Sequence, residues 1–475
     1  MIAGPILLLV IPLAMAGIVY LVLRWETLAA LLAIGTAMAL GFAIILLPLD
    51  QPVHVWGGQQ IALGETVSFF GRELILDPSD RVAMALFFFT SAILFALAWR
   101  IAPRSLFLPV GLGLLSLLSG ALLIRPLIYA ALLLVIAAAL SVFALQPAEG
   151  RPTRGGMRYL TFATLALPGL LVTHWLMDRY ALTPDDTSLL GISAVLLTIS
   201  FASLLGVVPF HTWVPAIFSD GVPLAGAFVL TVGNGAVWFL LLDFLEMYSW
   251  LSAHPEFDSL ILMAGTGLVI VGGLLAPAQR RVGSLVGYAA LVDTGAMLIA
   301  LGLNSKVGLT LLFLALLVRP VGVALMAVGL SGLRTCCGDD DRWDGMRGVG
   351  WQMPWSTTAL LFGGLSVAGF PVSAGFVWRW SLYRTLVSSH PGTAVCLLLA
   401  SIAVLGGVWH GLFVLLERPH SQKNRSVIPL VTTEGWVKGG VILVVVLICI
   451  GLGLFPQLVA PWASRLTDGY TFFVP

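Results

Sequence analysis

The chain has 475 residues, of which 59% are hydrophobic and only 10% are charged, and its formal net charge is +1. Soluble domains carry about a quarter charged residues, so most of this chain's surface must face lipid. No basic stripe is present to meet phosphates, which excludes nucleic-acid binding. The four cysteines show no CxxC spacing, and no other cluster of metal-ligating residues is evident, so we predict neither a metal site nor a bound cofactor.

Long apolar runs follow one another along almost the whole chain. A bilayer core about 30 Å thick is crossed by about 20 apolar residues in a helix. Runs of that kind lie near residues 2–23, 27–48, 82–99, 105–124, 127–145, 159–177, 188–218, 222–245, 259–277, 283–303, 307–333, 354–385, 393–416 and 436–458. We therefore predict an all-α integral membrane protein with about fourteen transmembrane helices. The first run lacks the basic segment and small-residue cleavage site of a signal peptide, so we expect it to be retained.

Two of these runs, the seventh and the twelfth, are too long for one straight crossing, and both contain helix breakers. The breakers are Gly206, Pro209 and Pro215 in helix 7 and Gly369, Pro371 and Gly375 in helix 12. Proline removes an amide donor, and in lipid the freed backbone groups are tolerated only where protein or a watery cavity satisfies them. Interrupted helices at matching positions, here five helices apart, indicate an ion or substrate path between inverted repeats. The alternative is a bundle with two simply kinked helices.

The breaks and apolar runs divide the chain into four predicted parts. Residues 1–104 hold helices 1–3, with a small β-hairpin in the loop 49–81 on the outer face. Residues 105–245 form the first five-helix repeat, helices 4–8, and residues 259–416 form the second, helices 9–13. Residues 436–475 hold helix 14 and a C-terminal tail.

The placement of Lys and Arg predicts the orientation. One set of alternate loops holds fourteen of these residues and the opposite set holds seven. Cytoplasmic loops carry the excess, so we expect a multi-pass protein of the bacterial inner (cytoplasmic) membrane with both termini on the non-cytoplasmic side. The acidic cluster Asp339-Asp340-Asp341 falls in the cytoplasmic loop 334–353. Its spacing does not match an EF-hand, and we expect it to be solvated.

Four segments resemble a known family. The first segment, 208–215 (VPFHTWVP) with 221–228 (GVPLAGAF), resembles the motif PFHxWLPDA…PxPVSALxH. The second, 280–295, has GYAALVDTG after a double arginine and resembles KRxLAYSSISHLG. Residues 369–379 (GFPVSAGFVWR) resemble GxPPxxGFxxK, and 344–354 resembles the GGLxRxMP lead-in. The family is that of the antiporter-like subunits of respiratory complex I, with Mrp-type cation/proton antiporters, membrane-bound hydrogenases and the membrane half of the DAB inorganic-carbon system as relatives. The resemblance implies a fourteen-helix fold with discontinuous helices 7 and 12.

The family's mid-membrane relay of lysines, glutamates and histidines is mostly replaced in this chain, which has only three lysines. A relay needs lysine, because arginine hardly releases its proton. Matching the family's motifs to this chain shows which residues occupy the relay positions. On helices 5, 7 and 8 they are Val135, Leu204 and Gly235, the last beside Asn234. On helix 10 Asp293 stands in place of histidine, on helix 11 the position is Arg319, and on helix 12 Arg379 stands in place of lysine. No Lys–Glu pair remains.

The remaining candidates for an ion path are Asp293, Arg319, Arg379, His211, Asp243, Glu246 and Asn234. An arginine at membrane depth needs a partner, and Asp293 suits either Arg319 or Arg379, as a fixed ion pair or as a proton relay. His211 lies in the broken segment of helix 7 and titrates near neutral pH. Asp243 and Glu246 lie near the end of helix 8 and suit either the interface or the path.

Three functions are compatible with this sequence. The first is a membrane subunit of a complex I-like, hydrogenase-like or Mrp-like assembly that translocates protons or Na⁺. The second is a non-conducting structural paralogue in such a complex, and the third is the membrane half of a DAB-type bicarbonate/CO₂ accumulating system. The expected partners are other membrane subunits, the lipid bilayer and, in some of these assemblies, a soluble redox or zinc-containing protein. No nucleotide loop or catalytic constellation is present, so any oxidoreductase activity would belong to the complex.

Overall fold

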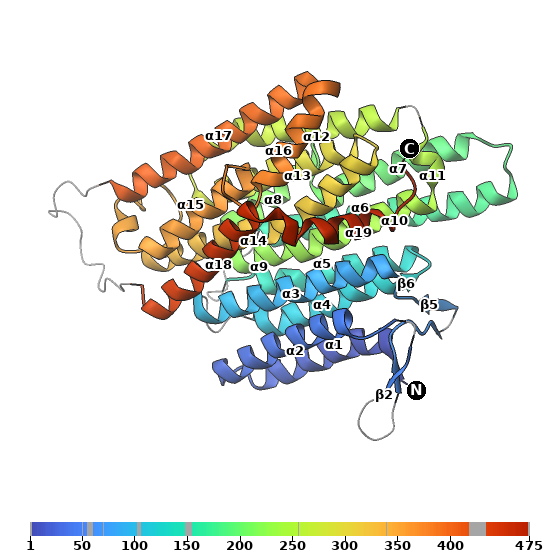
Figure 1. Ribbon diagram of the computed structural model, residues 1–475, viewed down its shortest axis with the longest axis horizontal. Coiled ribbons are helices and arrows are strands. Elements are labelled where there is room, and N and C mark those ends of the chain that lie inside the picture. The colour runs from blue at the N-terminus through green and yellow to red at the C-terminus, as the bar shows by residue number, and fades with distance from the viewer. Residues whose placement is uncertain are drawn as a thin grey trace.

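The computed structural model describes residues 2–49, 51–54, 60–69, 71–101, 106–147, 154–254, 256–338, 340–417 and 434–473. Most of its helices run roughly along the long axis of one bundle (Figure 1). They are α1 (Gly4–Leu21), α2 (Glu26–Leu46), α3 (Pro78–Ile101), α4 (Phe107–Leu123), α5 (Ile128–Leu145), α6 (Arg154–Leu182), α7 (Ser188–Leu205), α8 (Trp213–Asp220), α9 (Pro223–Phe228), α10 (Asn234–Met247), α11 (Ser249–Ser252), α12 (Phe257–Leu275), α13 (Val282–Leu301), α14 (Lys306–Cys337), α15 (Pro354–Ala368), α16 (Phe376–Ser389), α17 (Pro391–Leu416), α18 (Trp436–Leu454) and α19 (Ala460–Thr467).

Within the described residues, twelve helices are long and apolar enough to cross a membrane, with Ser188–Asp220 and Pro223–Met247 each taken as one. The sequence predicted about fourteen crossings. The two runs that fall short are 105–124, where α4 has only 17 residues, and 354–385, which forms α15 with 15 residues and α16 with 14. At 1.5 Å per residue, neither α15 nor α16 spans a bilayer core alone.

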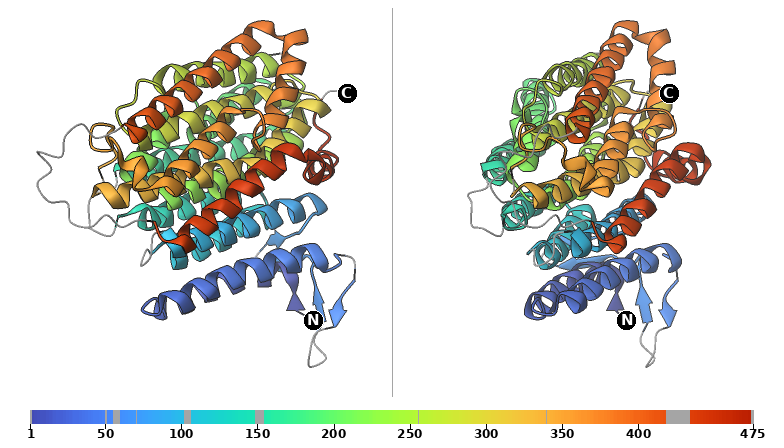
Figure 2. Two further views of the ribbon diagram at one scale, coloured as in Figure 1. Left: turned by 60° about the vertical axis from the view of Figure 1, so that its left-hand side comes forward. Right: turned by 90° about the vertical axis from the view of Figure 1, so that its left-hand side faces the viewer.

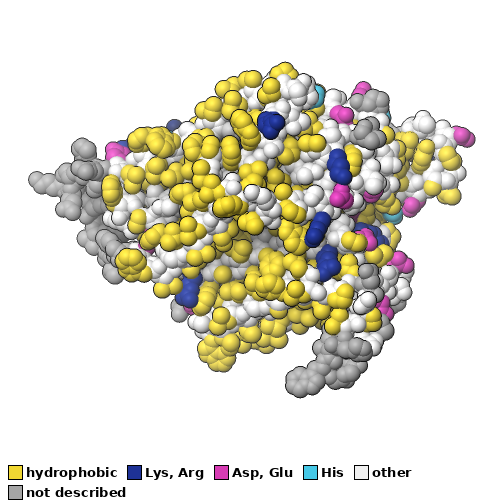
Figure 3. All heavy atoms as spheres, in the orientation of Figure 1, with side chains coloured by type: hydrophobic (Ala, Val, Ile, Leu, Met, Phe, Trp, Pro, Cys, Tyr) yellow, Lys and Arg dark blue, Asp and Glu magenta, His cyan; other side chains and the backbone are white. Residues whose placement is uncertain are grey.

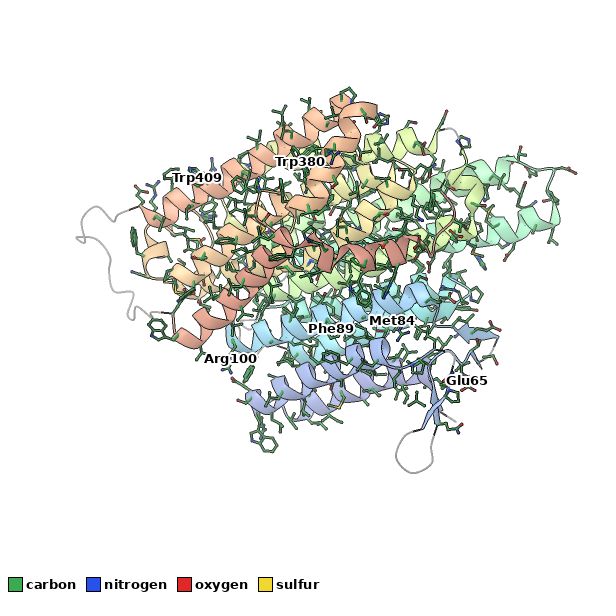
Figure 4. The ribbon with its side chains drawn as sticks, in the orientation of Figure 1. Glu65, Met84, Phe89, Arg100, Trp380 and Trp409 are labelled. Carbon is green, nitrogen blue, oxygen red and sulfur yellow. The ribbon has the colours of Figure 1, made fainter. Side chains whose placement is uncertain are left out.

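Burial separates the helices at the centre of the bundle from those at its surface. The apolar stretch of Pro223–Met247 is 100% buried and that of Lys306–Cys337 is 83% buried, whereas only 28% of α1 and of α18 is buried. Figure 2 shows α1 and α2 at one side of the bundle and α17 at the other. Hydrophobic side chains cover most of the face in Figure 3, with few charged groups among them. Trp380 on α16 and Trp409 on α17 are exposed on the same side (Figure 4), as expected for a surface that faces lipid or other membrane proteins.

Close backbone approach lets the central helices pack. A Cβ atom on Gly287 of α13 would lie only 2.3 Å from Cα of Pro215 in α8. Membrane helices depend on such small residues because lipid offers no hydrophobic drive for helix association. The contact seats the second half of the broken seventh helix directly against the helix that carries Asp293.

Both predicted helix breaks are present. Gly206 directly follows α7 and Gly369 directly follows α15. These glycines have φ values of 72° and 76°, a left-handed conformation that other residues adopt only with strain. The 3₁₀ turn η1 (Phe210–Thr212) precedes α8, and Gly375 is the residue before α16. The prediction that Pro215 is part of the break is wrong. Pro215 is buried in the first turn of α8, where proline is tolerated because the first amides of a helix have no intrahelical acceptor.

A second irregularity in helix 8 was not predicted. A short π-helix, η2 (Val229–Gly233), links α9 to α10. π-Helical turns are rare and occur mostly at functional sites. Asn234 is the first residue of α10 and therefore follows the irregular turn directly.

The loop 49–81 contains more β-structure than the single hairpin predicted. Its described part holds β2 (Val53–His54), β3 (Gln60–Ala62), β4 (Val67–Phe69) and β5 (Arg72–Leu74), which pair as two antiparallel hairpins. The β1 strand (Ile2–Ala3) extends the first hairpin, and β6 (Ile124–Arg125) extends the second. Residues 50, 55–59 and 70 of this loop lie outside the described residues. Both sheets and both ends of the described chain lie toward the same end of the bundle (Figure 1).

At the opposite end, Asp341 is buried, which corrects the expectation of a solvated acidic cluster. Its Oδ2 atom lies 2.7 Å from Nη2 of Arg334, and its Oδ1 atom lies 3.4 Å from Nε of Arg281. Arg334 also donates to the carbonyl oxygens of Ser219 and Gly221 at the end of α8. These carbonyls have no intrahelical donor, so the arginine satisfies them and the carboxylate balances its charge. Asp339 lies outside the described residues.

We predict that Asp341→Ala strongly destabilises the protein. Removing one partner of a buried ion pair leaves an uncompensated charge and costs about 3–5 kcal/mol. Thermal unfolding in detergent should therefore show a large fall in melting temperature. Asp344→Ala is the matched control because Asp344 is 94% exposed in the same loop, and its effect should stay within about 0.5 kcal/mol. Equal melting temperatures for the two variants would contradict the buried pair.

Candidate functional site

Asp293 lies at the centre of the bundle between two arginines. Its Oδ2 atom is 3.3 Å from Nε of Arg319 on α14, and its Oδ1 atom is 3.0 Å from Nη2 of Arg379 on α16. Asp293 is 4% exposed, Arg319 6% and Arg379 1%. The sequence left open which arginine pairs with Asp293, and the structure shows that both do. We call these three residues the Asp293 cluster.

The broken helix explains how Arg379 reaches this position. The last carbonyls of α15 have no intrahelical donors because the helix stops at Gly369. Arg379 lies in the first turn of α16, and its Nη2 atom donates to the carbonyl oxygen of Val367 at 3.0 Å while also holding Asp293. Its guanidinium lies 4.6 Å from the ring centre of Trp378. One side chain thus satisfies a backbone acceptor that the break exposes and pairs with the buried carboxylate.

Arg319 connects the cluster to helix 8. Its Nη2 atom donates to Oγ1 of Thr294 at 2.8 Å, and its Nη1 atom lies 3.4 Å from Oδ1 of Asn234 and 3.4 Å from Sδ of Met297. Asn234 is the first residue of α10 and directly follows the π-helix η2. The structure therefore brings four of the seven predicted residues together: Asp293, Arg319, Arg379 and Asn234.

The electrostatics of the Asp293 cluster are unbalanced. Two guanidinium groups face one carboxylate, so the cluster holds one excess positive charge when Asp293 is ionised. Arginine keeps its proton in proteins, so Asp293 is the only member whose charge can change. Each of its carboxylate oxygens has one arginine partner. The chemistry available here is the gain and loss of one proton, or the binding of an ion, inside a field set by two fixed charges.

His211 is not part of this cluster. It lies in η1 between α7 and α8 and is only half-buried, and its Nδ1 atom is enclosed without a hydrogen-bond partner. Among the described residues, no hydrogen bond or ion pair joins it to Asp293. The backbone around it reaches the protein surface, because Val208 and Pro209 are exposed.

The second break also reaches the surface of the chain. Phe370 and Val372 are exposed large hydrophobic residues within it, and Pro371 is exposed between them. Irregular backbone is not tolerated against lipid hydrocarbon, so both breaks need cover from protein or water.

Asp243 belongs to a different charged group at the end of the bundle that carries the sheets. Nη2 of Arg125 lies 3.5 Å from Asp243, 3.8 Å from Asp80 and 3.6 Å from Asp77. Tyr470 donates its hydroxyl to Oδ1 of Asp243 at 3.1 Å. Burial raises the pKa of Tyr470, and the nearby Asp243 raises it further, so the phenol stays protonated and remains a donor. We call Asp77, Asp80, Arg125 and Asp243 the α10-end cluster.

Glu246 anchors the residues near the C-terminus. Its carboxylate accepts from the backbone amide of Thr471 at 2.8 Å, from the Thr471 hydroxyl at 2.6 Å and from the amide of Phe472 at 3.1 Å. These bonds give Glu246 a structural role that fully accounts for its position near the helix end. Asp243 and Glu246 both lie near the end of α10, in contacts that are separate from the Asp293 cluster.

Several site residues were missed from the sequence. Thr294 directly follows Asp293, and its hydroxyl could have been noticed as a partner for an arginine one helix away. Asp80 sits in the first turn of α3, where an acidic residue is ordinarily explained by the helix dipole. Its pairing with Arg125 depends on the start of α3 meeting the strand β6, for which the sequence carries no signal. Among the described residues, no group of three or more His, Cys, Asp or Glu residues is arranged to hold a metal ion.

The fold is similar to subunits in several solved assemblies. A chain of the Mrp complex from Dietzia sp. matches with a TM-score of 0.77 at 17% identity, covering 98% of this chain and 97% of that one. A chain of the archaeal membrane-bound sulfane sulfur reductase also matches with a TM-score of 0.77, at 16% identity, covering 98% and 97%. A chain of respiratory complex I from Thermus thermophilus matches with a TM-score of 0.70 at 19% identity, covering 95% and 99%.

Curated relatives share more of the sequence. NADH-quinone oxidoreductase subunit N of Ectopseudomonas mendocina is 27% identical over 280 residues, which is 56% of this chain and 54% of the relative. Subunit N 1 of Solidesulfovibrio magneticus is 30% identical over 294 residues, 60% of this chain and 61% of the relative. The chain thus spans somewhat more than half the length of these relatives.

The family match itself covers residues 154–405, which is 252 of the 475 residues, and is described as NADH:quinone oxidoreductase/Mrp antiporter, transmembrane. It contains both helix breaks and all three residues of the Asp293 cluster. The protein is therefore a multi-pass integral membrane protein that belongs to the NADH:quinone oxidoreductase/Mrp antiporter family.

Proposed function

We propose that the chain is an antiporter-like membrane subunit of a multi-subunit complex I-like or Mrp-like assembly, and that it translocates protons or Na⁺. The observation that carries this proposal is the position of Asp293, a buried carboxylate held between helices α13, α14 and α16 beside the second helix break. Ionisable groups within a membrane are costly and mark ion paths by default. The relatives are named as subunits of NADH-quinone oxidoreductases, which supports the proposal that this chain is a subunit of such an assembly.

The membrane topology that we propose has fourteen crossings. Two are the short α4 and the pair α15–α16, which together with the twelve longer spans make fourteen. The two discontinuous helices, α7–α8 and α15–α16, share one design: a left-handed glycine, a proline within three residues and a new helix. This shared design supports inverted repeats at 105–245 and 259–416.

The orientation follows from the ends of the bundle. The described parts of both termini lie toward one end, which is expected for an even number of crossings (Figure 2). Five arginines gather at the opposite end, in the loop before α13, in the last turn of α14 and in the loop after it: Arg280, Arg281, Arg334, Arg342 and Arg347. By the positive-inside rule we assign that end to the cytoplasm of a bacterial inner membrane, which places both termini outside.

Proton transfer through the Asp293 cluster would work by making and breaking ion pairs. When Asp293 takes up a proton, it loses its attraction for both arginines, and when it releases the proton the pairs form again. Arg379 is the partner that can respond, because α16 is short and is joined to α15 by the non-helical residues 370–375. Arg319 lies within the continuous helix α14 and supplies a fixed field. Asp293 thus acts as the exchangeable group and the arginines as positioning residues.

A non-conducting structural role is the second candidate. It is favoured by the identity of Asp293's partners, since both are arginines and neither can pass a proton on. It does not require the two helix breaks, which a scaffold has no reason to keep. A DAB-type bicarbonate/CO₂ accumulating system is a third candidate, in which a soluble zinc-containing protein would be the partner.

We predict that Asp293→Asn lowers proton flux through the reconstituted complex by at least about tenfold, because the amide keeps the shape of the side chain but cannot exchange a proton. Flux can be followed with a pH-sensitive dye in proteoliposomes, at matched amounts of assembled complex. Asp344→Asn, at an exposed position, is the control and should leave flux unchanged. If the double variant Asp293→Asn/Arg379→Gln conducts as well as the wild type, the structural role is the better account.

We also predict that the native chain co-purifies with other membrane subunits in mild detergent. The exposed backbone at both breaks needs cover that this chain does not supply, and neighbouring membrane subunits would provide it. Mass spectrometry of the purified complex identifies the assembly. Flavin and iron–sulfur proteins would indicate a complex I-like or hydrogenase-like assembly, and further antiporter-like subunits would indicate an Mrp-like one. A zinc protein would indicate the inorganic-carbon system. A chain that purifies alone as a stable monomer would contradict the prediction.

A further inference from the structure

The Asp293 cluster contains more positive than negative charge. Arg319 and Arg379 are two fixed cations, and Asp293 is the one carboxylate that contacts them among the described residues. All three side chains are buried, with at most 6% of each residue exposed. An uncompensated buried charge is strongly unfavourable, and arginine cannot relieve it by losing a proton. The cluster therefore needs one more negative charge.

The unpaired polar atoms around the cluster are all hydrogen-bond donors. Nε and Nη1 of Arg379 and Nδ2 of Asn234 are buried and have no hydrogen-bond partner in the described structure. The carboxylate oxygens of Asp293 are both already engaged. Buried donors are nearly always paired in proteins, so the missing group is an acceptor. Water would satisfy the donors but would leave the charge in place.

The free donors of Arg379 lie beside the second helix break. A Cβ atom on Gly369 would lie 2.7 Å from Cγ and 3.5 Å from Nε of Arg379, so the side chain runs along the end of α15. The next residues, Phe370 to Val372, are exposed at the surface of the chain. The break therefore places exposed residues next in the chain to the end of α15 along which Arg379 runs, and it contains no acidic side chain that would repel an anion.

We propose that the unpaired N–H groups of Arg379 bind a small monovalent inorganic anion of the chloride or bicarbonate kind. One such anion balances the single excess charge and supplies acceptors to the unpaired N–H groups. The burial of Arg379 excludes large anions, and the single excess positive charge favours a monovalent one. This site does not depend on the proposed translocation of protons or Na⁺, because a scaffold that keeps both arginines would need the same counter-ion.

The test measures anion binding to the full chain, purified with the subunits that accompany it. Radiolabelled chloride is titrated by equilibrium dialysis in sodium gluconate at constant ionic strength, and unlabelled bicarbonate is used as the competitor. We expect saturable binding of about one anion per chain. Arg379→Gln removes the charge that contacts the anion and should weaken binding at least about tenfold. Arg384→Gln is the matched control, because Arg384 is exposed on the same helix and should not affect binding.

Two further variants separate binding from structural damage because they change the charge in known directions. Asp293→Asn removes the competing carboxylate and should strengthen chloride binding, even though it is expected to stop proton flux. Asn234→Asp places a carboxylate beside Arg319 and should abolish anion binding, since the cluster then carries its own counter-charge. A merely structural disturbance would weaken binding in both variants.

The outcomes separate the proposal from its competitors. Binding of chloride, of bicarbonate or of both with this pattern of variants supports the site and identifies which anion it takes. The proposal is overturned if wild type binds neither anion saturably, or if Arg379→Gln and Asn234→Asp both leave binding unchanged. Loss of proton flux in Asp293→Asn tests the proposed function alone, so the two ideas can fail independently.

Discussion

The pairing of one buried carboxylate with two arginines constrains the centre of this protein more than any other interaction. Asp293 ties α13 to α14 through Arg319 and to α16 through Arg379. Removing the carboxylate would leave two guanidinium groups facing each other inside the bundle, where like charges are not screened by solvent. The helix break after α15 serves the same arrangement, because Arg379 satisfies the carbonyl of Val367 that the break leaves without a donor.

The chain keeps the fold of its family, but the residues at the positions of the family's relay differ. The resemblance implies lysines at the positions of Leu204 and Arg379, and a histidine at that of Asp293. A buried lysine can release its proton, whereas arginine maintains a permanent field. Proton exchange at the Asp293 cluster is therefore limited to the carboxylate. The two arginines determine how strongly Asp293 is held and how much negative charge the site attracts from elsewhere.

Sequence patterns predicted the features that depend on local physics. The apolar runs predicted the helices, because the number of apolar residues needed to cross a bilayer is a property of a short segment. Gly206 and Gly369 predicted the breaks, because glycine adopts a left-handed backbone conformation without strain. The pairing of Asp293 with an arginine followed from the cost of buried charge. The pairing of Asp341 with Arg281 and the anchoring of Thr471 by Glu246 were not predictable, since each depends on partners far apart in the chain. Pro215 was misjudged because proline breaks a helix interior but begins one comfortably.

Helix α10 connects two charge clusters of opposite imbalance. Asn234, at its start, contacts the Asp293 cluster, where two guanidinium groups face one carboxylate. Asp243, near its end, belongs to the α10-end cluster, where three carboxyl groups share the single guanidinium of Arg125. The α10-end cluster has more carboxyl groups than cationic groups, and the Asp293 cluster has more cationic groups than carboxyl groups. In the proposed ion path, Arg319 and Arg379 would oppose the passage of a cation, and the Asp293 carboxylate would offset only one of these two charges.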